Sequence, residues 1–112
     1  MEKSDRIKQF EKVLAMDPND STTYFGLGQA YFNEAFYDEA ATTLKKGISL
    51  NPEHTASYYL LSQALSKSGK KEELIEILKK GIEVGEKQGD RIPTEKMIAK
   101  FHRHTKDTAS GE

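Results

Sequence analysis

The side chains best suited to acid–base or metal chemistry are the three histidines, and their spacing argues against both. His102 and His104 are two residues apart, and on a helix that spacing turns them about 200° away from each other. They therefore cannot readily share a metal ion. His54 follows Pro52 closely and has no acid–base partner near it in the sequence. Because the chain also contains no cysteine, the sequence predicts no metal site and no thiol chemistry.

Serine, threonine and carboxylate side chains lack the surroundings that make them catalytic. The sequence contains neither a G-x-S-x-G motif nor a glycine-rich phosphate loop. The acidic pair Glu72–Glu73 is typical of the start of a helix, where the helix dipole favours negative charge. We therefore expect no catalytic set, no enzyme activity and no cofactor.

Charge and hydropathy exclude further classes of partner. The chain has 112 residues and a formal net charge of −1, which suits one small domain without an overall field towards nucleic acid or anionic lipid. No apolar run approaches the length of a membrane span. The basic stretch Lys96–Lys106 is interpreted as the solvated face of a terminal helix, because no aromatic ladder accompanies it. We expect a cytoplasmic protein with neither a nucleic acid nor a membrane as its partner.

One pattern does favour a binding function. Phe25 and Phe32 lie on a second apolar face of a helix that already carries Tyr24 and Tyr31 on its first face. A helix that is apolar on two faces needs two neighbours or a ligand, and nearby amides can hydrogen-bond a peptide backbone. Packing of the rings against one another is the open alternative. With the matching positions of a second helix, the predicted partner-binding residues are Thr22, Phe25, Gln29, Phe32, Asn33, Tyr59, Gln63, Ser66 and Lys67.

The elements that carry this face are repeated. The word LKKGI occurs at 44–48 and again at 78–82, 34 residues later. The same offset pairs Tyr24 with Tyr58, and apolar residues recur at helical spacing throughout both copies. Prolines and short polar turns separate these helices. Each copy is predicted to be a helical hairpin that must stack on neighbours to bury its apolar face.

The glycine inside the repeated word predicts close helix packing. Glycine in a helix interior costs about 1 kcal/mol relative to alanine, so two copies of it call for a packing reason. We expect Gly28, Ala40, Gly47 and Gly81 to mark the places where helix backbones approach most closely.

The repeat resembles the tetratricopeptide repeat family. Residues 24–52 read Y-x2-L-G-x2-Y, then A-x3-L, then P, against the family pattern W-x2-L-G-x2-Y, A-x3-F, P at a period of about 34. The second copy is looser, with Ser62 in the glycine position and Glu86 in the proline position. The resemblance implies a right-handed α-solenoid whose first helices line a concave groove for an extended peptide or a partner helix.

Some members of that family hold the C-terminal carboxylate of chaperones with lysines, asparagines and an arginine in this groove. The comparable places in this chain carry Phe25, Gln29, Ala56 and Leu60, which supply no such charge. An apolar or mixed peptide is therefore the expected partner.

We predict a single all-α domain over residues 1–112, with about 2.5 repeats and a C-terminal capping helix. The expected parts are a half repeat at 3–16, repeats at 21–54 and 55–88, the capping helix at 93–105 and a frayed tail at 106–112. The half repeat is explained equally by a natural cap and by excision from a larger protein.

The predicted function is that of a non-catalytic protein–protein interaction module. The alternative is a self-assembling scaffold or a regulatory module of a larger protein. In that alternative, exposed faces of the terminal helices form a homo-oligomer through Ile7, Phe10 and Leu14.

Overall fold

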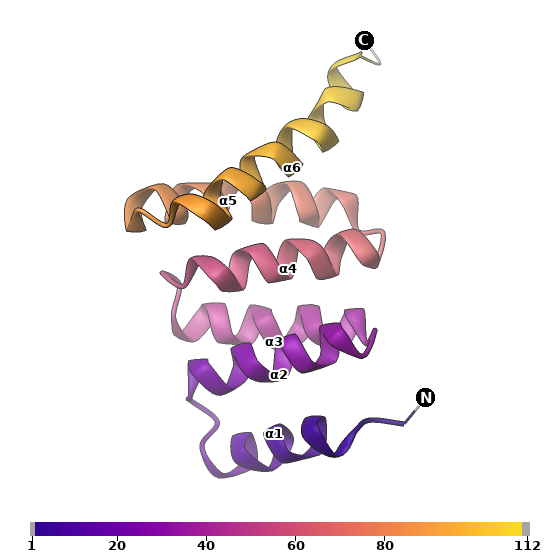
Figure 1. Ribbon diagram of the computed structural model, residues 1–112, viewed down its shortest axis with the longest axis vertical. Helices are drawn as coiled ribbons and strands as arrows, with labels where there is room; N and C mark the ends of the chain where they lie inside the picture. Colours follow the sequence, from indigo (N-terminus) through magenta and orange to yellow (C-terminus); the bar gives the residue numbers. More distant parts are fainter. Residues whose placement is uncertain (1, 111–112) are drawn as a thin grey trace.

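The computed structural model describes residues 2–110, with side chains described through Lys106. Within this range the chain forms six helices and no strand, stacked one above the other (Figure 1). This confirms the predicted all-α class. The helices are α1 (Asp5–Met16), α2 (Ser21–Asn33), α3 (Tyr37–Leu50), α4 (Thr55–Lys67), α5 (Lys71–Gln88) and α6 (Arg91–Ser110).

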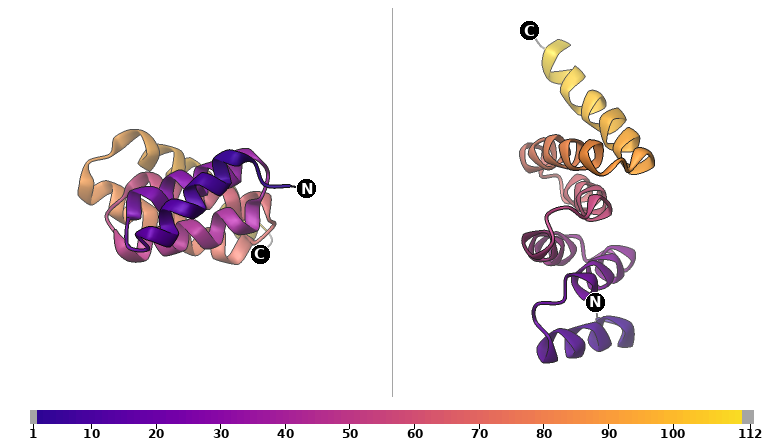
Figure 2. Two further views of the ribbon diagram at one scale, coloured as in Figure 1. Left: turned by 90° about the horizontal axis from the view of Figure 1, so that it is seen from below. Right: turned by 90° about the vertical axis from the view of Figure 1, so that its left-hand side faces the viewer.

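The helices form two layers. Figure 2 shows α2 and α4 on one side of the stack and α3 and α5 on the other. Each helix contacts the next one in the sequence, and α4 also contacts α2 and α6. The hairpins α2–α3 and α4–α5 lie inside the two predicted repeat ranges, 21–54 and 55–88. The first helices of the repeats therefore share one face of the molecule.

The two repeats are held by the same local bonds. The Tyr24 hydroxyl donates to the Pro18 carbonyl at 2.9 Å, and 34 residues later the Tyr58 hydroxyl donates to the Pro52 carbonyl at 2.8 Å. Each bond fixes the turn that enters a first helix. The repeat period thus extends to individual hydrogen bonds.

The glycines of the repeated word pack against these same tyrosines. A Cβ on Gly47 would lie 3.0 Å from the Tyr24 Cβ, and a Cβ on Gly81 would lie 2.8 Å from the Tyr58 Cβ. At Gly28, a Cβ would meet the Leu44 side chain at 2.6 Å. The predicted close approach is confirmed at these three glycines, and it explains why the chain tolerates glycine inside helices.

The turns between the paired helices also repeat. Ala35 has φ of +66° and Gly69, 34 residues later, has φ of +72°. This left-handed conformation costs glycine little free energy and is unfavourable for a residue with a Cβ. Ala35 therefore carries local backbone strain that Gly69 avoids.

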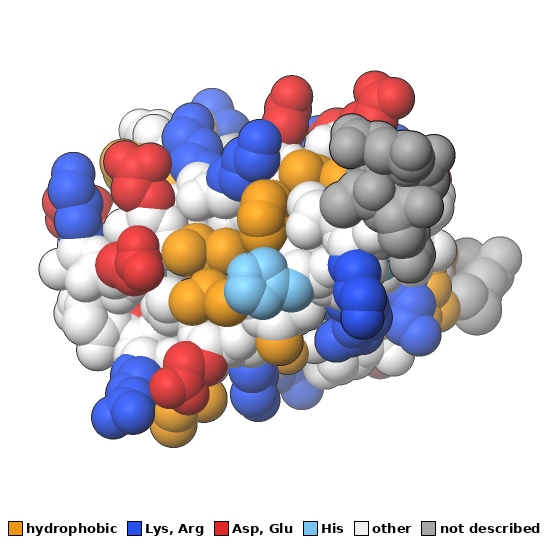
Figure 3. Space-filling view, turned by 90° about the horizontal axis from the view of Figure 1, so that it is seen from above, with side chains coloured by type: hydrophobic (Ala, Val, Ile, Leu, Met, Phe, Trp, Pro, Cys, Tyr) orange, Lys and Arg blue, Asp and Glu red, His pale blue; other side chains and the backbone are white. Residues whose placement is uncertain are grey.

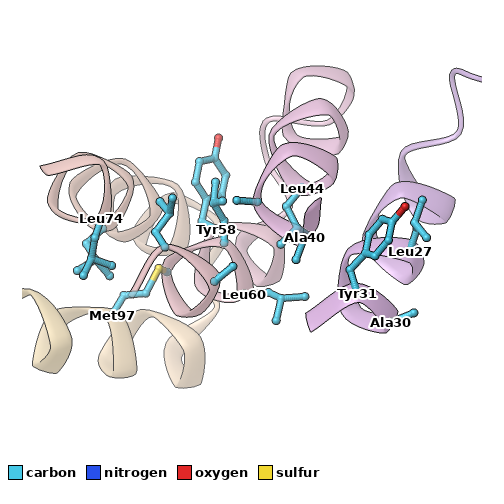
Figure 4. Close-up of a cluster of buried hydrophobic side chains, with 14 of the residues drawn as sticks. Leu27, Ala30, Tyr31, Ala40, Leu44, Tyr58, Leu60, Leu74 and Met97 are labelled. Carbon is cyan, nitrogen blue, oxygen red and sulfur yellow. The ribbon is translucent and has the colours of Figure 1, made fainter. Parts of the chain in front are cut away.

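A continuous core runs between the layers (Figure 4). Tyr58, Leu61, Leu74 and Leu78 are almost completely buried between α4 and α5. Met97 of α6 is also completely buried and lies against Gly81. The capping helix thus covers the apolar side of the second repeat, as its apolar residues predicted.

Helix α6 is longer than the sequence indicated. It begins at Arg91, so that Pro93 sits in its first turn, where proline loses no helical hydrogen bond. It continues to Ser110, five residues beyond the predicted end at 105. Within it the Thr105 hydroxyl donates to the Phe101 carbonyl at 2.7 Å. Residues 111–112 of the predicted frayed tail lie outside the described residues.

The outer face at the α6 end of the stack is mixed in character. Figure 3 shows hydrophobic side chains gathered near its centre beside a histidine, with both basic and acidic side chains around them. Ile92 of α6 is 69% exposed. Among the described residues, no helix is both long enough and apolar enough to cross a bilayer.

The predicted homo-oligomer contact through α1 is not supported. Ile7 is completely buried, and the Phe10 ring lies where a Cβ on Gly26 would be only 2.8 Å away. Leu14 is half-buried against the core. The apolar face of α1 was interpreted as free because no helix precedes it, but α2 already covers it.

Polar contacts attach α1 to the C-terminal part of α2. The Tyr31 hydroxyl donates to Glu11 Oε2 at 2.6 Å, and Lys3 Nζ lies 2.8 Å from the same oxygen. The Ser4 hydroxyl donates to Glu34 at 2.6 Å. Hydrogen bonds from Lys3 and then from Tyr31 lower the pKa of Glu11.

Candidate partner-binding groove

The nine predicted partner-binding residues lie on α2 and α4, and none of them is buried. We call this set the inner strip. Its residues on α2 are spaced three, four and three residues apart from Thr22 to Phe32, with Asn33 directly after Phe32. Those on α4 are spaced four and three residues apart from Tyr59 to Ser66, with Lys67 directly after Ser66. These spacings place each group along one face of its helix. Because α2 and α4 contact each other, the two faces lie side by side.

One end of the inner strip contains a small pocket of about 50 Å³. Thr22 and Phe25 of the inner strip line it, together with Ser21, Gly47, Asn51, His54 and Ser57. The Phe25 ring meets the His54 ring edge-on, with the centroids 4.9 Å apart. The pocket has room for a small side chain rather than for a cofactor.

His54 and Ser57 form a close pair that is structural rather than catalytic. His54 Nδ1 lies 2.6 Å from Ser57 Oγ, a distance that a nucleophile and its base could also show. Ser57 is only 4% exposed, and its backbone N–H donates to the His54 carbonyl at 3.0 Å in the first turn of α4. The pair therefore lies in the first turn of α4, where Ser57 has little exposure to solvent and lines the pocket beside Phe25.

The three aromatic rings of the inner strip do not stack on one another. Phe32 meets Tyr37 edge-on at 5.4 Å, and no ring contact of the described residues joins any two of Phe25, Phe32 and Tyr59. All three are half-buried and pack against the core. Each ring thus presents one part to the core and another part to solvent.

Helix α6 extends this face beyond α4. Lys96 Nζ lies 5.7 Å from the centroid of the Tyr59 ring, within the range of a cation–π contact. Burial, followed by the charges of Arg103 and Lys67, lowers the pKa of Lys100. Basic side chains from α4 and α6 are therefore close enough for their charges to lower the pKa of a neighbouring lysine.

Sequence reasoning placed Lys67 in the site but did not bring the basic residues of α6 into it. The signal that could have done so is the repeat period, because α4 begins at Thr55 and α6 begins at Arg91, close to one period later. Helix α6 thus takes the position of a third first helix. The basic stretch that was interpreted as a plain solvated face borders the inner strip.

Nothing else in the described residues suggests catalysis or metal binding. No group of three or more histidine, cysteine, aspartate or glutamate side chains is placed to hold a metal ion in the part of the chain that the structure describes. The arrangement offers apolar rings, amides and positive charge along an open face, which is suited to binding.

Comparison with known proteins agrees with this geometry. Residues 4–81 match the family model described as anaphase-promoting complex, cyclosome, subunit 3. Among curated proteins, none matches this chain in sequence.

Solved structures share the fold at low sequence identity. The type III secretion translocator chaperone SycD of Yersinia enterocolitica superposes with a TM-score of 0.85 at 17% identity, over 92% of this chain and 72% of that one. The TPR2B domain of yeast Sti1, solved in a complex with Hsp70, has a TM-score of 0.80 at 14% identity, over 90% and 81%. The first TPR domain of Spaghetti (RPAP3), bound to an HSP90 peptide, has a TM-score of 0.76 at 17% identity, over 92% and 77%.

Proposed function

The chain belongs to the family described as anaphase-promoting complex, cyclosome, subunit 3, whose repeats are tetratricopeptide-like, and we propose that it is a non-catalytic module that binds a segment of a partner protein. The segment lies along the inner strip as an extended peptide or a helix. The observation that carries this proposal is that all nine residues of the inner strip stay outside the buried core although three of them are aromatic. Aromatic side chains that remain accessible on one face mark interaction sites.

The similar structures support a peptide as the ligand. The Sti1 domain was solved with Hsp70 and the RPAP3 domain with an HSP90 peptide. Both share the helical stack of this chain, which supports a peptide as the ligand here.

The chemistry of the inner strip favours an apolar or mixed segment over a bare C-terminal carboxylate at the α2 end. Phe25 and Gln29 of α2 carry no charge, and Leu60 of α4 is only 8% exposed. The pocket beside Phe25 can take a small apolar side chain, and the amide groups of Gln29 and Gln63 can hydrogen-bond the peptide backbone.

Selection from a random 12-residue peptide display library tests this proposal. We expect immobilised protein to enrich peptides whose binding is lost in Phe25→Ala. The matched control is Phe36→Ala, because Phe36 is also a half-buried phenylalanine packed on the core with an edge-on ring contact, at 6.1 Å from Tyr31. Phe36 lies outside the inner strip. The Phe36→Ala variant therefore measures the effect of lost stability on binding while the binding face stays unchanged.

Two results would contradict the proposal. One is a selection that enriches no peptide at all. The other is a set of peptides whose binding falls equally in Phe25→Ala and in Phe36→Ala, since the inner strip would then play no specific part.

A further inference from the structure

Four basic side chains border the inner strip without acidic partners. Lys96, Lys100 and Arg103 are spaced four and three residues apart on α6, so they lie along one face of that helix. Lys67 ends α4 and belongs to the inner strip. We call these four residues the basic cluster.

Four basic side chains of the described surface form ion pairs, whereas those of the basic cluster, like the exposed Lys46 and Lys79, form none. Elsewhere Lys3 pairs with Glu11, Lys45 with Glu73, Lys70 with Asp38 and Arg91 with Glu95. Among the side chains that the structure describes, no acidic group lies within ion-pair distance of the basic cluster. Its positive charge is therefore not neutralised by the described part of the chain.

One member of the basic cluster, Lys100, is partly withdrawn from water, whereas the other three are exposed. Lys100 is half-buried, and burial together with the neighbouring Arg103 and Lys67 lowers its pKa. Like charges held together in a partly buried position raise the free energy of the unliganded state. A bound anion would relieve this repulsion.

The position of the basic cluster links it to the proposed peptide-binding face. Lys96 lies over the ring of Tyr59, which is an inner-strip residue, and Lys67 belongs to both sets. A peptide that follows the inner strip along α4 therefore meets the basic cluster at the side of α6.

From this juxtaposition we infer that the basic cluster binds aspartate or glutamate side chains of the partner segment. The inference rests on the proposed function and specifies the partner's chemistry: apolar at the Phe25 end and acidic beside α6. Electrostatic complementarity of this kind fixes the register and direction of a bound peptide.

The extent of the basic cluster sets the number of acidic residues. Lys96 and Arg103 are seven residues apart, which is about 10 Å along a helix at 1.5 Å per residue. An extended peptide rises about 3.3 Å per residue, so this length corresponds to about three peptide residues. The expected motif therefore holds two or more acidic side chains within three or four positions, rather than one terminal carboxylate.

A phosphate backbone is less well suited to this place. The chain as a whole has a net charge of −1, so no general field attracts a polyanion. Tyr59, the inner-strip ring that contacts the basic cluster, already has Lys96 over it, which makes it a poor platform on which a base could stack.

The test compares peptide selections on three proteins. Lys67→Glu with Lys100→Glu reverses the charge at two of the four positions, so the formal charge of the basic cluster becomes zero; we call this the charge-reversed variant. Lys46→Glu with Lys79→Glu is the matched control. Both control lysines are exposed helix residues of α3 and α5. Circular dichroism first establishes that all three proteins have the same helix content.

We expect the native chain and the control variant to enrich random 12-residue peptides that contain clustered acidic residues. The charge-reversed variant should lose that enrichment. A synthetic peptide from the enriched pool should bind the charge-reversed variant at least tenfold more weakly than it binds the control. Amidating the C-terminus of that peptide should leave its affinity unchanged.

Each other outcome has a distinct meaning. If peptides that depend on Phe25 are enriched without acidic residues, the present inference is overturned and the proposed function stands. If no peptide is enriched, the proposed function itself fails. A third outcome is that a random 12-nucleotide single-stranded RNA binds the native chain as tightly as the selected peptides and binds the charge-reversed variant weakly. In that case the basic cluster binds phosphate groups, and the inference is wrong.

Discussion

Substitution of Gly28 by alanine tests the packing that holds each hairpin together. In an unconstrained helix this change stabilises by about 1 kcal/mol, because alanine has the higher helix propensity. In this structure the new Cβ would lie 2.6 Å from both Cγ and Cδ2 of Leu44 and 3.4 Å from its Cδ1. Overpacking of this kind costs about 1–3 kcal/mol. We therefore expect Gly28→Ala to lower the free energy of unfolding by about 0–2 kcal/mol instead of raising it.

The reversal of sign should depend on Leu44 alone, because all three of the nearest atoms belong to its side chain. Leu44→Ala by itself should cost about 2–5 kcal/mol through the cavity that it leaves. In that background, Gly28→Ala meets no clash and should stabilise by about 1 kcal/mol. The double-mutant cycle should thus give a favourable coupling of about 1–3 kcal/mol.

Urea unfolding followed by circular dichroism at 222 nm measures all four proteins. The account of close packing is refuted if Gly28→Ala alone raises the free energy of unfolding by about 1 kcal/mol, since the helices would then not be in contact at this position. It is equally refuted if the effects of the two substitutions simply add.

Further predictions concern the repeated glycine, the turns and the attachment of α1. Gly47→Leu should destabilise by about 1–3 kcal/mol through overpacking, and a negligible loss in urea unfolding would show that this position faces solvent. Ala35→Gly should raise the free energy of unfolding by about 0.5 kcal/mol, because the relief of left-handed strain exceeds the entropy cost of glycine; a lower value in thermal melts would contradict the strain at φ of +66°. The pKa of Glu11 is lowered in the folded state by its hydrogen bonds from Lys3 and Tyr31, so its contribution is present above the pKa of the unfolded carboxyl and is lost as the pH falls through the folded value. The free energy of unfolding should therefore fall more steeply for the native chain than for Glu11→Gln between neutral pH and pH 3, and parallel curves would show that the bonds add nothing.

The fold could be predicted because the residues that recur after 34 positions have the same packing role in each repeat. Tyr24 and Tyr58 supply the same hydrogen bond in both repeats, and Gly47 and Gly81 fit against them. A pattern of this kind specifies neighbours as well as helices. The helix order and the close contacts therefore followed from the sequence.

The ends of the chain were harder to predict because the period no longer constrains them. Ile7 was expected on an exposed face of α1, yet α2 buries it completely. The contacts of Glu11 with Tyr31 and of Ser4 with Glu34 have no counterpart elsewhere in the sequence and could not be read from it.

The inner strip was predicted as a set of residues, and the structure adds the contacts that those residues make. Phe25 meets His54 beside a pocket, and Phe32 meets Tyr37 of its own hairpin. These contacts depend on side-chain directions that spacing alone does not give. The charge repulsion between Lys67 and Lys100 likewise depends on α6 lying against α4.

The most direct test of the central claim is the affinity of one library-selected peptide for the native chain and for Phe25→Ala with Tyr59→Ala, measured by isothermal titration at a temperature where both proteins are folded. If the inner strip holds the partner segment, the double substitution weakens binding at least tenfold, while Phe36→Ala leaves the dissociation constant unchanged. Equal affinity of the peptide for the native chain and the folded double variant would contradict the account.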